Sequence, residues 1–479
     1  MNLQAAARQE MIDHGFDPDF PKGTVEQLAE IKSHPPTAAA NASDLRNLLW
    51  SSIDNDTSRD LDQAEVAERV SAGIRVMVAV ADVDASVHSA TPIDRHACSQ
   101  TTSVYTGVKT FSMLPEELST DLTSLNQDAD RVAMVVEYVV APDGSITAPN
   151  FYRALIRNRA QLAYNAVGAW LENSAPAPPK VAASAELQAQ LKLQDEAAQQ
   201  LCTARHRVGA IDFDREEAEP IITDGQVRDL AIRKRNRATQ LIEDFMVASN
   251  QVMAQALSRA GVAAIRRVVK IPERWPRIVA LAAAHGEKLP ADPDSGALNV
   301  FLKKLRDSDS AHYADLSLAI IKLMGPGEYV LARPGEAPGH FALAVHDYTH
   351  STAPNRRFAD LVTQRLIKSV LDKQPPPYGT QELDSIANNC TLKEDAARKV
   401  ERVMGKRIAA VALTPRIGQS FDAIVTGVTP KGTFVRITNP LAEGLLVHGQ
   451  EGVDVGDELR VKLISTDPQR GYIDFVTGH

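Results

Sequence analysis

Four aspartates crowd into one short segment, and they limit how the surrounding chain can fold. The segment Ser52–Gln63 reads SIDNDTSRDLDQ and follows a short apolar run. So many neighbouring carboxylates repel one another unless a positive charge lies among them. The simplest counter-charge is a divalent, oxygen-preferring cation, Mg²⁺ first and Mn²⁺ as its substitute. The segment therefore predicts a metal site.

Three interpretations of this segment remain open from the residues alone. An EF-hand-like calcium loop would begin at Asp54, but Arg59 stands where the sharp turn needs glycine, and the following run Gly73–Val83 is typical of a strand. A catalytic Mg²⁺ site would use Asp60 and Asp62, which share a face if extended, with Asp54 reaching the same point. A solvated acidic loop is the third. We favour the catalytic site.

Further motifs appear in a fixed order along the chain. They include Ile53-Asp54, Asp60-Leu61-Asp62-Gln63-Ala64, Thr102-Ser103-Val104-Tyr105, Met113-Leu114-Pro115, Asp130-Arg131-Val132-Ala133-Met134, Leu241-Ile242-Glu243-Asp244-Phe245-Met246 and Tyr348 to Asp360. From about Asp44 to Lys406 the chain resembles the ribonuclease II family of processive 3′→5′ exoribonucleases, whose catalytic (RNB) domain carries these motifs.

The resemblance implies roles for the acidic segment. Asp54, Asp60 and Asp62 would be catalytic and would hold the metal together with Gln63, and replacing Asp62 by its amide would stop cleavage but leave RNA binding. Gln63 departs from the family, which has a carboxylate there. Its carbonyl oxygen could still contact a metal, but it brings no negative charge for a second ion. Two cations about 4 Å apart would supply the nucleophile and neutralise the leaving oxygen.

The late arginine motif predicts an anion contact. Pro354 is typical of a helix start that would place Arg356 and Arg357 in the first turn. Cations there oppose the helix dipole unless an anion is shared with the helix-end amides. The resemblance implies that Arg356 is catalytic and that both arginines contact RNA. The alternative is that they only pair with Asp360 or Asp347.

Three other residues are candidate RNA contacts. By resemblance, Glu243, in a predicted helix over Ala238–Ala256, holds the terminal nucleotide; from the residues alone, a surface pair with Arg237 is equally good. Tyr105 would stack on a base near the active site, and Phe213 would form the opposite face of that clamp. Buried aromatic residues more often belong to the core.

The last part of the chain is typical of a small all-β barrel. Short strands are predicted at Phe421–Val425, Gly432–Ile437, Gly444–Val447, Leu459–Leu463 and Tyr472–Phe475. The segment resembles an S1-type RNA-binding repeat of the OB fold. By analogy Phe421, Phe434 and His448 would face bases, although the phenylalanines could instead be barrel core.

Composition bounds the class of protein. The chain has 479 residues and a formal net charge of −9, which disfavours broad nonspecific coating of nucleic acid. Basic residues cluster at 228–237 and 393–407, where they could guide RNA or be solvated surface charges. Three scattered cysteines favour a reduced, cytoplasmic protein, and no apolar run is long enough for a membrane span.

We therefore predict an α+β chain with three parts. Residues 1–45 form a short helical segment that braces the catalytic domain or forms a helix-turn-helix-like module, 46–410 a large mixed α/β RNB domain, and 411–479 an S1-type barrel. Helices are predicted at 2–14, 24–33 and 43–50.

The predicted function is hydrolysis of single-stranded RNA to nucleoside 5′-monophosphates by a monomer, with no dinucleotide cofactor and no membrane. The alternative is a weakened or inactive relative that acts as an RNA-binding regulator.

Overall fold

A curved sheet forms the centre of the large domain in the computed structural model, which describes residues 2–211, 217–223, 225–308, 310–430 and 432–478. Its order is β1-β8-β2-β3-β4-β7. The strands are β1 (Ser43–Asp44), β2 (Trp50–Asp54), β3 (Gln63–Val70), β4 (Gly73–Ala81), β7 (Asp130–Val140) and β8 (Ile146–Ala163). The early part of β8 pairs with β7 and its late part with β2, so the sheet curls on itself.

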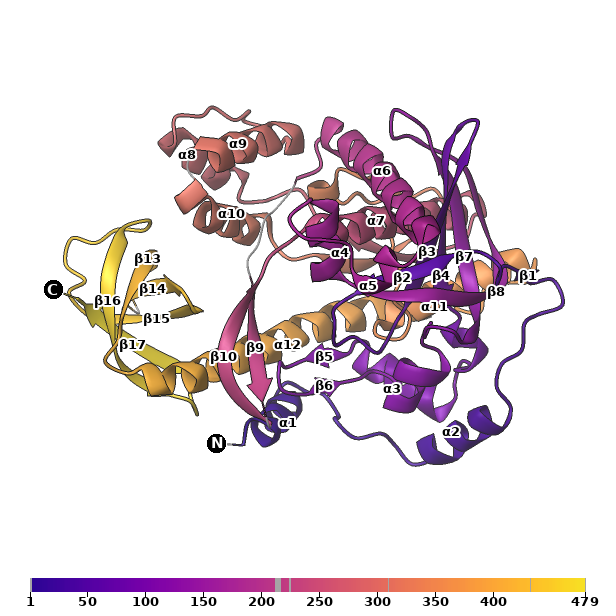
Figure 1. Cartoon of the computed structure of the whole chain (residues 1–479), viewed down its shortest axis with the longest axis horizontal. Helices are drawn as coiled ribbons and strands as arrows, with labels where there is room; N and C mark the ends of the chain where they lie inside the picture. The colour runs from indigo at the N-terminus through magenta and orange to yellow at the C-terminus, as the bar shows by residue number, and fades with distance from the viewer. Residues whose placement is uncertain (1, 212–216, 224, 309, 431, 479) are drawn as a thin grey trace.

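Helices cover this sheet and form the main core with it (Figure 1). Those in contact with the sheet or with each other are α4 (Tyr164–Leu171), α5 (Pro179–Ala182), α6 (Ala185–Arg207), α7 (Arg237–Arg259) and α11 (Phe358–Leu371). The helix α3 (Pro92–Gln100) contributes Ile93 and Ala97 to the same core. The predicted helix around Glu243 is confirmed as α7. Its Asn236 caps the N-terminus in a capping box with Thr239, which explains why the helix begins at Arg237.

A separate group of helices has its own hydrophobic cluster around Trp275, Leu298 and Phe301. It contains α8 (Trp275–Ala284), α9 (Ser295–Ser308) and α10 (Ser310–Met324), and it is joined to the large domain by the antiparallel pair β11 (Ala264–Val268) and β12 (Glu328–Ala332). In Figure 1 these helices lie at the upper left, above the barrel.

One long helix, α12 (Thr380–Leu413), connects the catalytic domain to the barrel (Figure 1). Its first turns join the main core through Leu383 and Ile386, and its last turns join the barrel core through Ile408 and Leu413. The hairpin β9 (Glu217–Thr223) and β10 (Gln226–Arg233) lies beside it, and Arg416 makes two 2.8 Å contacts with Asp229 of β10. The barrel is therefore anchored to two elements of the larger domain.

The C-terminal barrel is closed, as predicted. Its order is β13-β14-β15-β17-β16. The strands are β13 (Ser420–Thr429), β14 (Gly432–Thr438), β15 (Leu441–His448), β16 (Glu458–Asp467) and β17 (Tyr472–Thr477). The predicted positions hold, and most strands are a few residues longer because their ends continue the ladder into the turns.

The N-terminal helices are α1 (Leu3–Asp13) and α2 (Thr24–Ser33). α1 packs against α12, where Arg407 donates to Glu10 at 2.7 Å, and α2 packs against α3. The helix predicted for 43–50 is wrong. Ser43 and Asp44 pair instead with β8, and Trp50 begins β2, because the edge of the curled sheet offers the backbone partners that a local helix would otherwise provide. None of the described helices combines the length and apolar character required to cross a bilayer.

Candidate active site

The acidic segment forms a loop between two strands, and this geometry rules out a helix-loop-helix calcium site. Asp54 ends β2, and Asp60 and Asp62 lie just before β3. The Ser124 hydroxyl fixes the loop: it accepts from the Leu61 N–H at 2.9 Å and donates to the Arg59 carbonyl at 2.8 Å. These contacts hold Asp60 and Asp62 at one end of the sheet.

Asp62 is buried and faces the arginine motif from far along the chain. Its Oδ1 accepts the Asn355 backbone N–H at 3.0 Å, and its Oδ2 lies 3.3 Å from Arg356 Nε. Burial raises the pKa of Asp62 to about 7, and the positive charge of Arg356 opposes that rise. A buried carboxylate with so few donors is poised to accept a further positive partner.

Asp54 and Asp60 are the other two carboxylates of this candidate site. Asp54 Oδ1 accepts the Asn55 N–H at 2.7 Å and the Ser58 hydroxyl at 2.8 Å, and burial raises its pKa. Asp60 Oδ2 accepts the Tyr105 hydroxyl at 3.2 Å. The structure thus brings Asp54, Asp60, Asp62 and Arg356 to one place, which we name the acidic corner.

The oxygen donors of the acidic corner fit a hard divalent cation in chemistry. Among the described residues, however, no group of three or more Asp, Glu, His or Cys side chains converges tightly enough to hold a metal by itself. Mg²⁺ commonly uses one or two carboxylates and takes its other ligands from water and substrate phosphates. Asp62 Oδ2 is buried without a hydrogen-bond partner, which leaves one oxygen available.

Arg356 and Arg357 do not lie inside a helix as predicted. The helix α11 begins at Phe358, and Arg357 occupies its N-cap with extended backbone. The reason is that the segment pairs elsewhere: the Arg356 carbonyl accepts the Ser103 N–H at 3.0 Å, and the Phe358 N–H donates to the Thr101 carbonyl at 2.8 Å. Neither guanidinium therefore sits within the first helical turn.

The two arginine side chains have different partners. Arg357 donates to Asp360 through Nε at 2.8 Å and Nη2 at 2.7 Å. For Arg357 the structure therefore contains the ion pair that the sequence left as the alternative. The Arg356 side chain remains 43% exposed beside Asp62.

Tyr105 lies at the surface beside the acidic corner. It ends β5 (Val104–Tyr105), which pairs with β6 (Thr110–Phe111), and 42% of the residue is exposed. Its backbone N–H donates to Glu401 of α12 at 3.0 Å. Tyr105 is thus not a core residue, and its ring is available to a ligand.

Glu243 has a different partner from the one expected. It pairs with Arg235 at 2.8 Å, whereas Arg237 is engaged by Asp195. The difference arises because Arg237 faces α6, while Glu243 is on the exposed side of α7 near the preceding loop. Phe213 lies outside the described residues.

In the barrel, the three residues that we predicted to face bases differ in their exposure to solvent. Phe421 is wrong as a surface residue: it is buried in the cluster formed by the barrel, α12 and Leu230, because its position on β13 points inward. Phe434 is half-buried and His448 is exposed at the end of β15. Only these two are accessible to a ligand.

Two residues at the corner were missed from the sequence. Asn355 holds Asp62 through its backbone and accepts the Thr123 hydroxyl at 2.6 Å. Glu65 is fully buried on β3. A charged residue between Ala64 and Val66, in a run that is otherwise apolar, was the signal for Glu65; no sequence signal marked Asn355.

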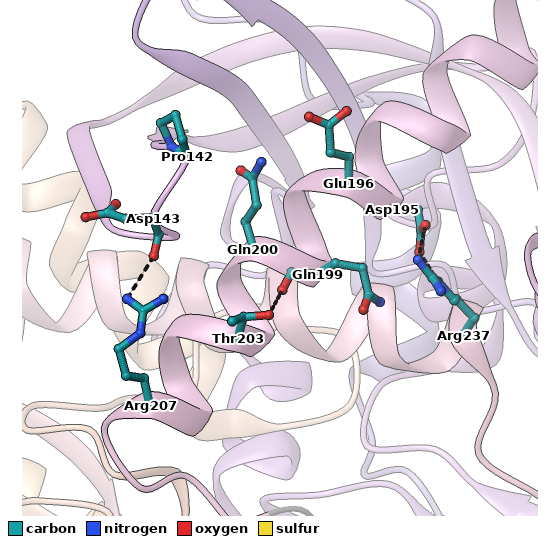
Figure 2. Close-up of a pocket in the computed structure, with 9 residues that line it drawn as sticks. All are labelled: Pro142, Asp143, Asp195, Glu196, Gln199, Gln200, Thr203, Arg207 and Arg237. Carbon is teal, nitrogen blue, oxygen red and sulfur yellow. Dashed lines mark hydrogen bonds and ion pairs between the residues drawn. The ribbon is translucent and has the colours of Figure 1, made fainter.

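A cavity of about 430 Å³ lies elsewhere, along α6 and the turn between β7 and β8 (Figure 2). Its charged side chains are engaged within the protein: Arg237 pairs with Asp195, and Arg207 donates to the Asp143 carbonyl at 3.4 Å. No candidate catalytic residue lines it. The acidic corner, rather than this cavity, is therefore the candidate site.

Comparison with known proteins agrees with this architecture. The RNB domain model matches residues 42–373, and the model of the RNase II-type exonuclease C-terminal S1 domain matches 419–477. Ribonuclease R of Escherichia coli is 30% identical over 449 residues, covering 89% of this chain and 54% of that protein. Ribonuclease R 1 of Lactococcus lactis is 28% identical over 491 residues, covering 95% and 59%. The chain thus spans a little over half the length of these relatives.

A solved structure shows the same fold. Mycoplasma genitalium RNase R, in complex with ribose-methylated single-stranded RNA, aligns with a TM-score of 0.86 at 23% identity, covering 100% of this chain and 78% of that one. The predicted α+β architecture with a C-terminal S1-type barrel is confirmed. Since the RNB model matches well over half of the residues, the chain belongs to the RNB family.

Proposed function

We propose that this chain is a metal-dependent 3′→5′ exoribonuclease that degrades single-stranded RNA to nucleoside 5′-monophosphates. The observation that carries the proposal is the contact of buried Asp62 with Asn355 and Arg356, which joins the acidic loop to the arginine motif across most of the chain. Polarity and processivity rest on membership of the RNB family.

The metal belongs to the proposal, and nucleases of this family are metal-dependent in general. Asp54, Asp60 and Asp62 would hold it, with Mg²⁺ as the preferred ion and Mn²⁺ as its substitute. When bound, the metal would activate water and neutralise charge on the phosphate. The support for this assignment is Asp62 Oδ2, a buried oxygen that accepts no hydrogen bond and has only the ion-pair contact with Arg356 at 3.3 Å.

The other residues of the corner would position the RNA. Arg356, with a partly exposed guanidinium 3.3 Å from Asp62, would bind the phosphate at which cleavage occurs and stabilise the charge that develops there. The exposed Tyr105 ring would stack on a base, and its hydroxyl contact with Asp60 would fix the ring relative to the carboxylates. Glu243, already paired with Arg235, would contact the terminal nucleotide only if that pair opened.

The barrel would deliver RNA to the corner. Phe434 and His448 are its accessible candidates, and the connection through α12 fixes the barrel relative to the catalytic domain. The N-terminal helices would brace that arrangement, because α1 packs on α12. Cys98, Cys202 and Cys390 form no disulfide with one another, which supports a reducing, cytoplasmic location.

A second function is favoured by one observation. Gln63 is buried at the corner and neutral where the family has a carboxylate, so the site has one negative charge fewer for a cation. An inactive relative that binds RNA and regulates it would have this feature.

The experiment that separates the two uses RNA labelled at its 5′ end. The purified protein and its Asp62→Asn variant are incubated with single-stranded RNA in Mg²⁺ and, separately, in Mn²⁺, and products are resolved by size over time. Stepwise shortening from the 3′ end, lost in Asp62→Asn, supports the exonuclease. Intact RNA that nevertheless shifts in mobility with both proteins would support the RNA-binding regulator instead.

A further inference from the structure

Three hydrogen bonds close a ring beside the acidic corner. The Leu61 N–H donates to the Ser124 hydroxyl at 2.9 Å. The Thr123 hydroxyl donates to Asn355 Oδ1 at 2.6 Å, and the Asn355 N–H donates to Asp62 Oδ1 at 3.0 Å. Leu61 and Asp62 are consecutive in the chain, as are Thr123 and Ser124, so peptide bonds complete the ring. This hydrogen-bond ring ties together three segments that are far apart in the sequence.

The hydrogen-bond ring is shielded from water. Its five members are at most 5% exposed: Leu61, Asp62, Thr123, Ser124 and Asn355. In such a low-dielectric interior a hydrogen bond is electrostatically stronger than at the surface. The ring is therefore able to hold the acidic loop and the arginine motif in one fixed arrangement.

The segment that carries Thr123 has an unusual backbone. Thr123 follows a π-helical turn, Leu118–Leu122, and its N–H donates to the Leu118 carbonyl at 3.0 Å. Turns of this kind are rare in proteins and often occur at functional sites. Arg131 of β7 supports the segment, because its Nε donates to the Ser124 carbonyl at 2.9 Å. The Thr123 hydroxyl is thus presented from a braced position.

The stability of the fold does not account for the Asn355 amide. Asn355 Nδ2 is buried and has no hydrogen-bond partner among the described residues. A buried donor without a partner destabilises a fold relative to an apolar side chain of similar size. The Thr123 hydroxyl, in contrast, also lies 2.8 Å from the Leu118 carbonyl, so it would keep a partner without Asn355. An apolar residue at position 355 would therefore satisfy the fold at least as well.

The location of Asn355 indicates a different role for its side chain. Its backbone holds Asp62, and the next residue is Arg356, whose Nε lies 3.3 Å from Asp62 Oδ2. Because the side chain is anchored to Thr123, the residue is held at both ends. If that anchor were lost, Asp62 and Arg356 could both shift. A displacement of about 1 Å in a reacting group can slow a reaction by about 10²-fold.

We propose that Thr123 and Asn355 are a pair of positioning residues, whose side-chain hydrogen bond fixes Asp62 and Arg356 in the geometry required to cleave RNA. Neither side chain touches RNA, because both are buried. The inference rests on the proposed function, since it assumes that cleavage occurs at the acidic corner. Loss of the pair should lower the rate of cleavage but leave RNA affinity and stability unchanged.

The test removes each half of the pair and measures single-turnover cleavage of a 5′-labelled RNA in Mg²⁺. Asn355→Leu keeps the backbone N–H and a similar volume, and Thr123→Val removes only the hydroxyl. Each variant is expected to cleave about 10- to 100-fold more slowly than wild type. Affinity for RNA, measured by fluorescence anisotropy in EDTA, should stay within about twofold of wild type, because the pair acts only on the reacting groups.

Two further variants separate positioning from a general loss of structure. Thr123→Ser keeps a hydroxyl and should cleave at nearly the wild-type rate. The double variant Thr123→Val/Asn355→Leu should be no slower than the slower single variant, because both substitutions break the same hydrogen bond. Additive losses in the double variant would mean that the two side chains act independently, which overturns the pair.

Matched controls remove a buried hydroxyl and a buried amide elsewhere. The Thr363 hydroxyl on α11 donates to the Ala359 carbonyl at 2.9 Å within its own helix. Asn299 on α9 is 3% exposed, and its Oδ1 has no hydrogen-bond partner among the described residues. Thr363→Val and Asn299→Leu should both cleave RNA at nearly the wild-type rate.

Hydrogen exchange followed by mass spectrometry tests the hydrogen-bond ring without measuring activity. Thr123→Val should speed exchange both in the peptide that contains Leu61 and in the peptide that contains Asn355, because the same ring protects both amides. A merely local role of the Thr123 hydroxyl would leave exchange at Leu61 and Asn355 unchanged.

The possible failures can be told apart. Wild-type cleavage rates in Asn355→Leu and Thr123→Val would overturn the positioning role and leave the proposed function intact. Slow cleavage with an equal loss of RNA affinity would overturn it as well, because the pair would then affect binding. If the wild type binds RNA but does not cleave it, the proposed function and this inference both fail. If Asn355→Leu does not fold, the comparison of Thr123→Val with Thr123→Ser decides.

Discussion

Arg356 and Arg357 are neighbours in the chain, and each lies beside a buried aspartate, but they are held very differently. Arg357 makes two short contacts with Asp360, and its side chain is 22% exposed. Arg356 makes one longer contact with Asp62 and is 43% exposed. A guanidinium whose donors are used stabilises the fold, whereas one with spare donors at an acidic corner can bind a phosphate.

The largest expected effect is the loss of stability when the ion pair between Arg357 and Asp360 is removed. Arg357→Ala would leave Asp360 buried without its cation, which we expect to lower the free energy of unfolding by about 3–5 kcal/mol. Urea unfolding monitored by circular dichroism measures it. In the double variant Arg357→Ala/Asp360→Asn much of that loss should return. A double variant as unstable as the single one would mean that Arg357 contributes by packing alone.

Asp62, the aspartate beside Arg356, should make the stability of the metal-free protein depend on pH. The pKa of Asp62 is about 7 in the folded protein, against an ordinary value of 3.8. The folded state therefore holds this proton more tightly, so its contribution to stability is complete below about pH 3.8 and is lost as the pH rises to about 7, by up to about 4 kcal/mol.

Urea unfolding in EDTA across this pH range measures the loss. Asp62→Asn should flatten the pH dependence, and Mg²⁺ should restore stability to the wild type near pH 7. A pH dependence that is the same in Asp62→Asn would show that other groups cause it.

Variants of Tyr105 test whether an exposed side chain beside the acidic corner binds RNA. Tyr105→Ala should weaken binding of single-stranded RNA by about 1–3 kcal/mol because a stacking surface is lost. Tyr105→Phe keeps the ring and loses only the contact with Asp60, so its affinity should stay near that of the wild type. Fluorescence anisotropy with the cleavage-deficient Asp62→Asn protein as background measures both. Equal losses in the two variants would assign the role to the hydroxyl instead.

The same distinction between available and engaged side chains applies in the barrel, with a smaller expected effect. Phe434→Ala should reduce RNA affinity by about 1 kcal/mol, at the lower end for one stacked base, and leave stability nearly unchanged. Phe421→Ala should instead destabilise the barrel, because Phe421 is part of its core. Calorimetric unfolding and RNA titration of both variants provide the comparison. A stable Phe421→Ala protein with impaired RNA binding would reverse the assignment.

Local patterns were enough to predict the helix around Glu243, the barrel strands and the loop position of Asp54, Asp60 and Asp62. They were not enough where a distant segment decided the outcome. The region 43–50 has helical spacing of leucines but pairs with β8, and the helix after Pro354 begins late because Ser103 pairs with Arg356. The contact of Asp62 with Asn355 and the inward position of Phe421 likewise depend on tertiary packing, which periodicity does not report.

The central claim is that Arg356 serves catalysis and Arg357 serves the fold. The most direct measurement is single-turnover cleavage of a 5′-labelled RNA by Arg356→Ala and Arg357→Ala, at a temperature where circular dichroism shows both to be folded. We predict that Arg356→Ala is slower by about 10²–10³-fold, as when a charge-stabilising donor is removed, and that Arg357→Ala stays within about tenfold of wild type. Equal losses, or a greater loss in Arg357→Ala, would contradict the division of roles.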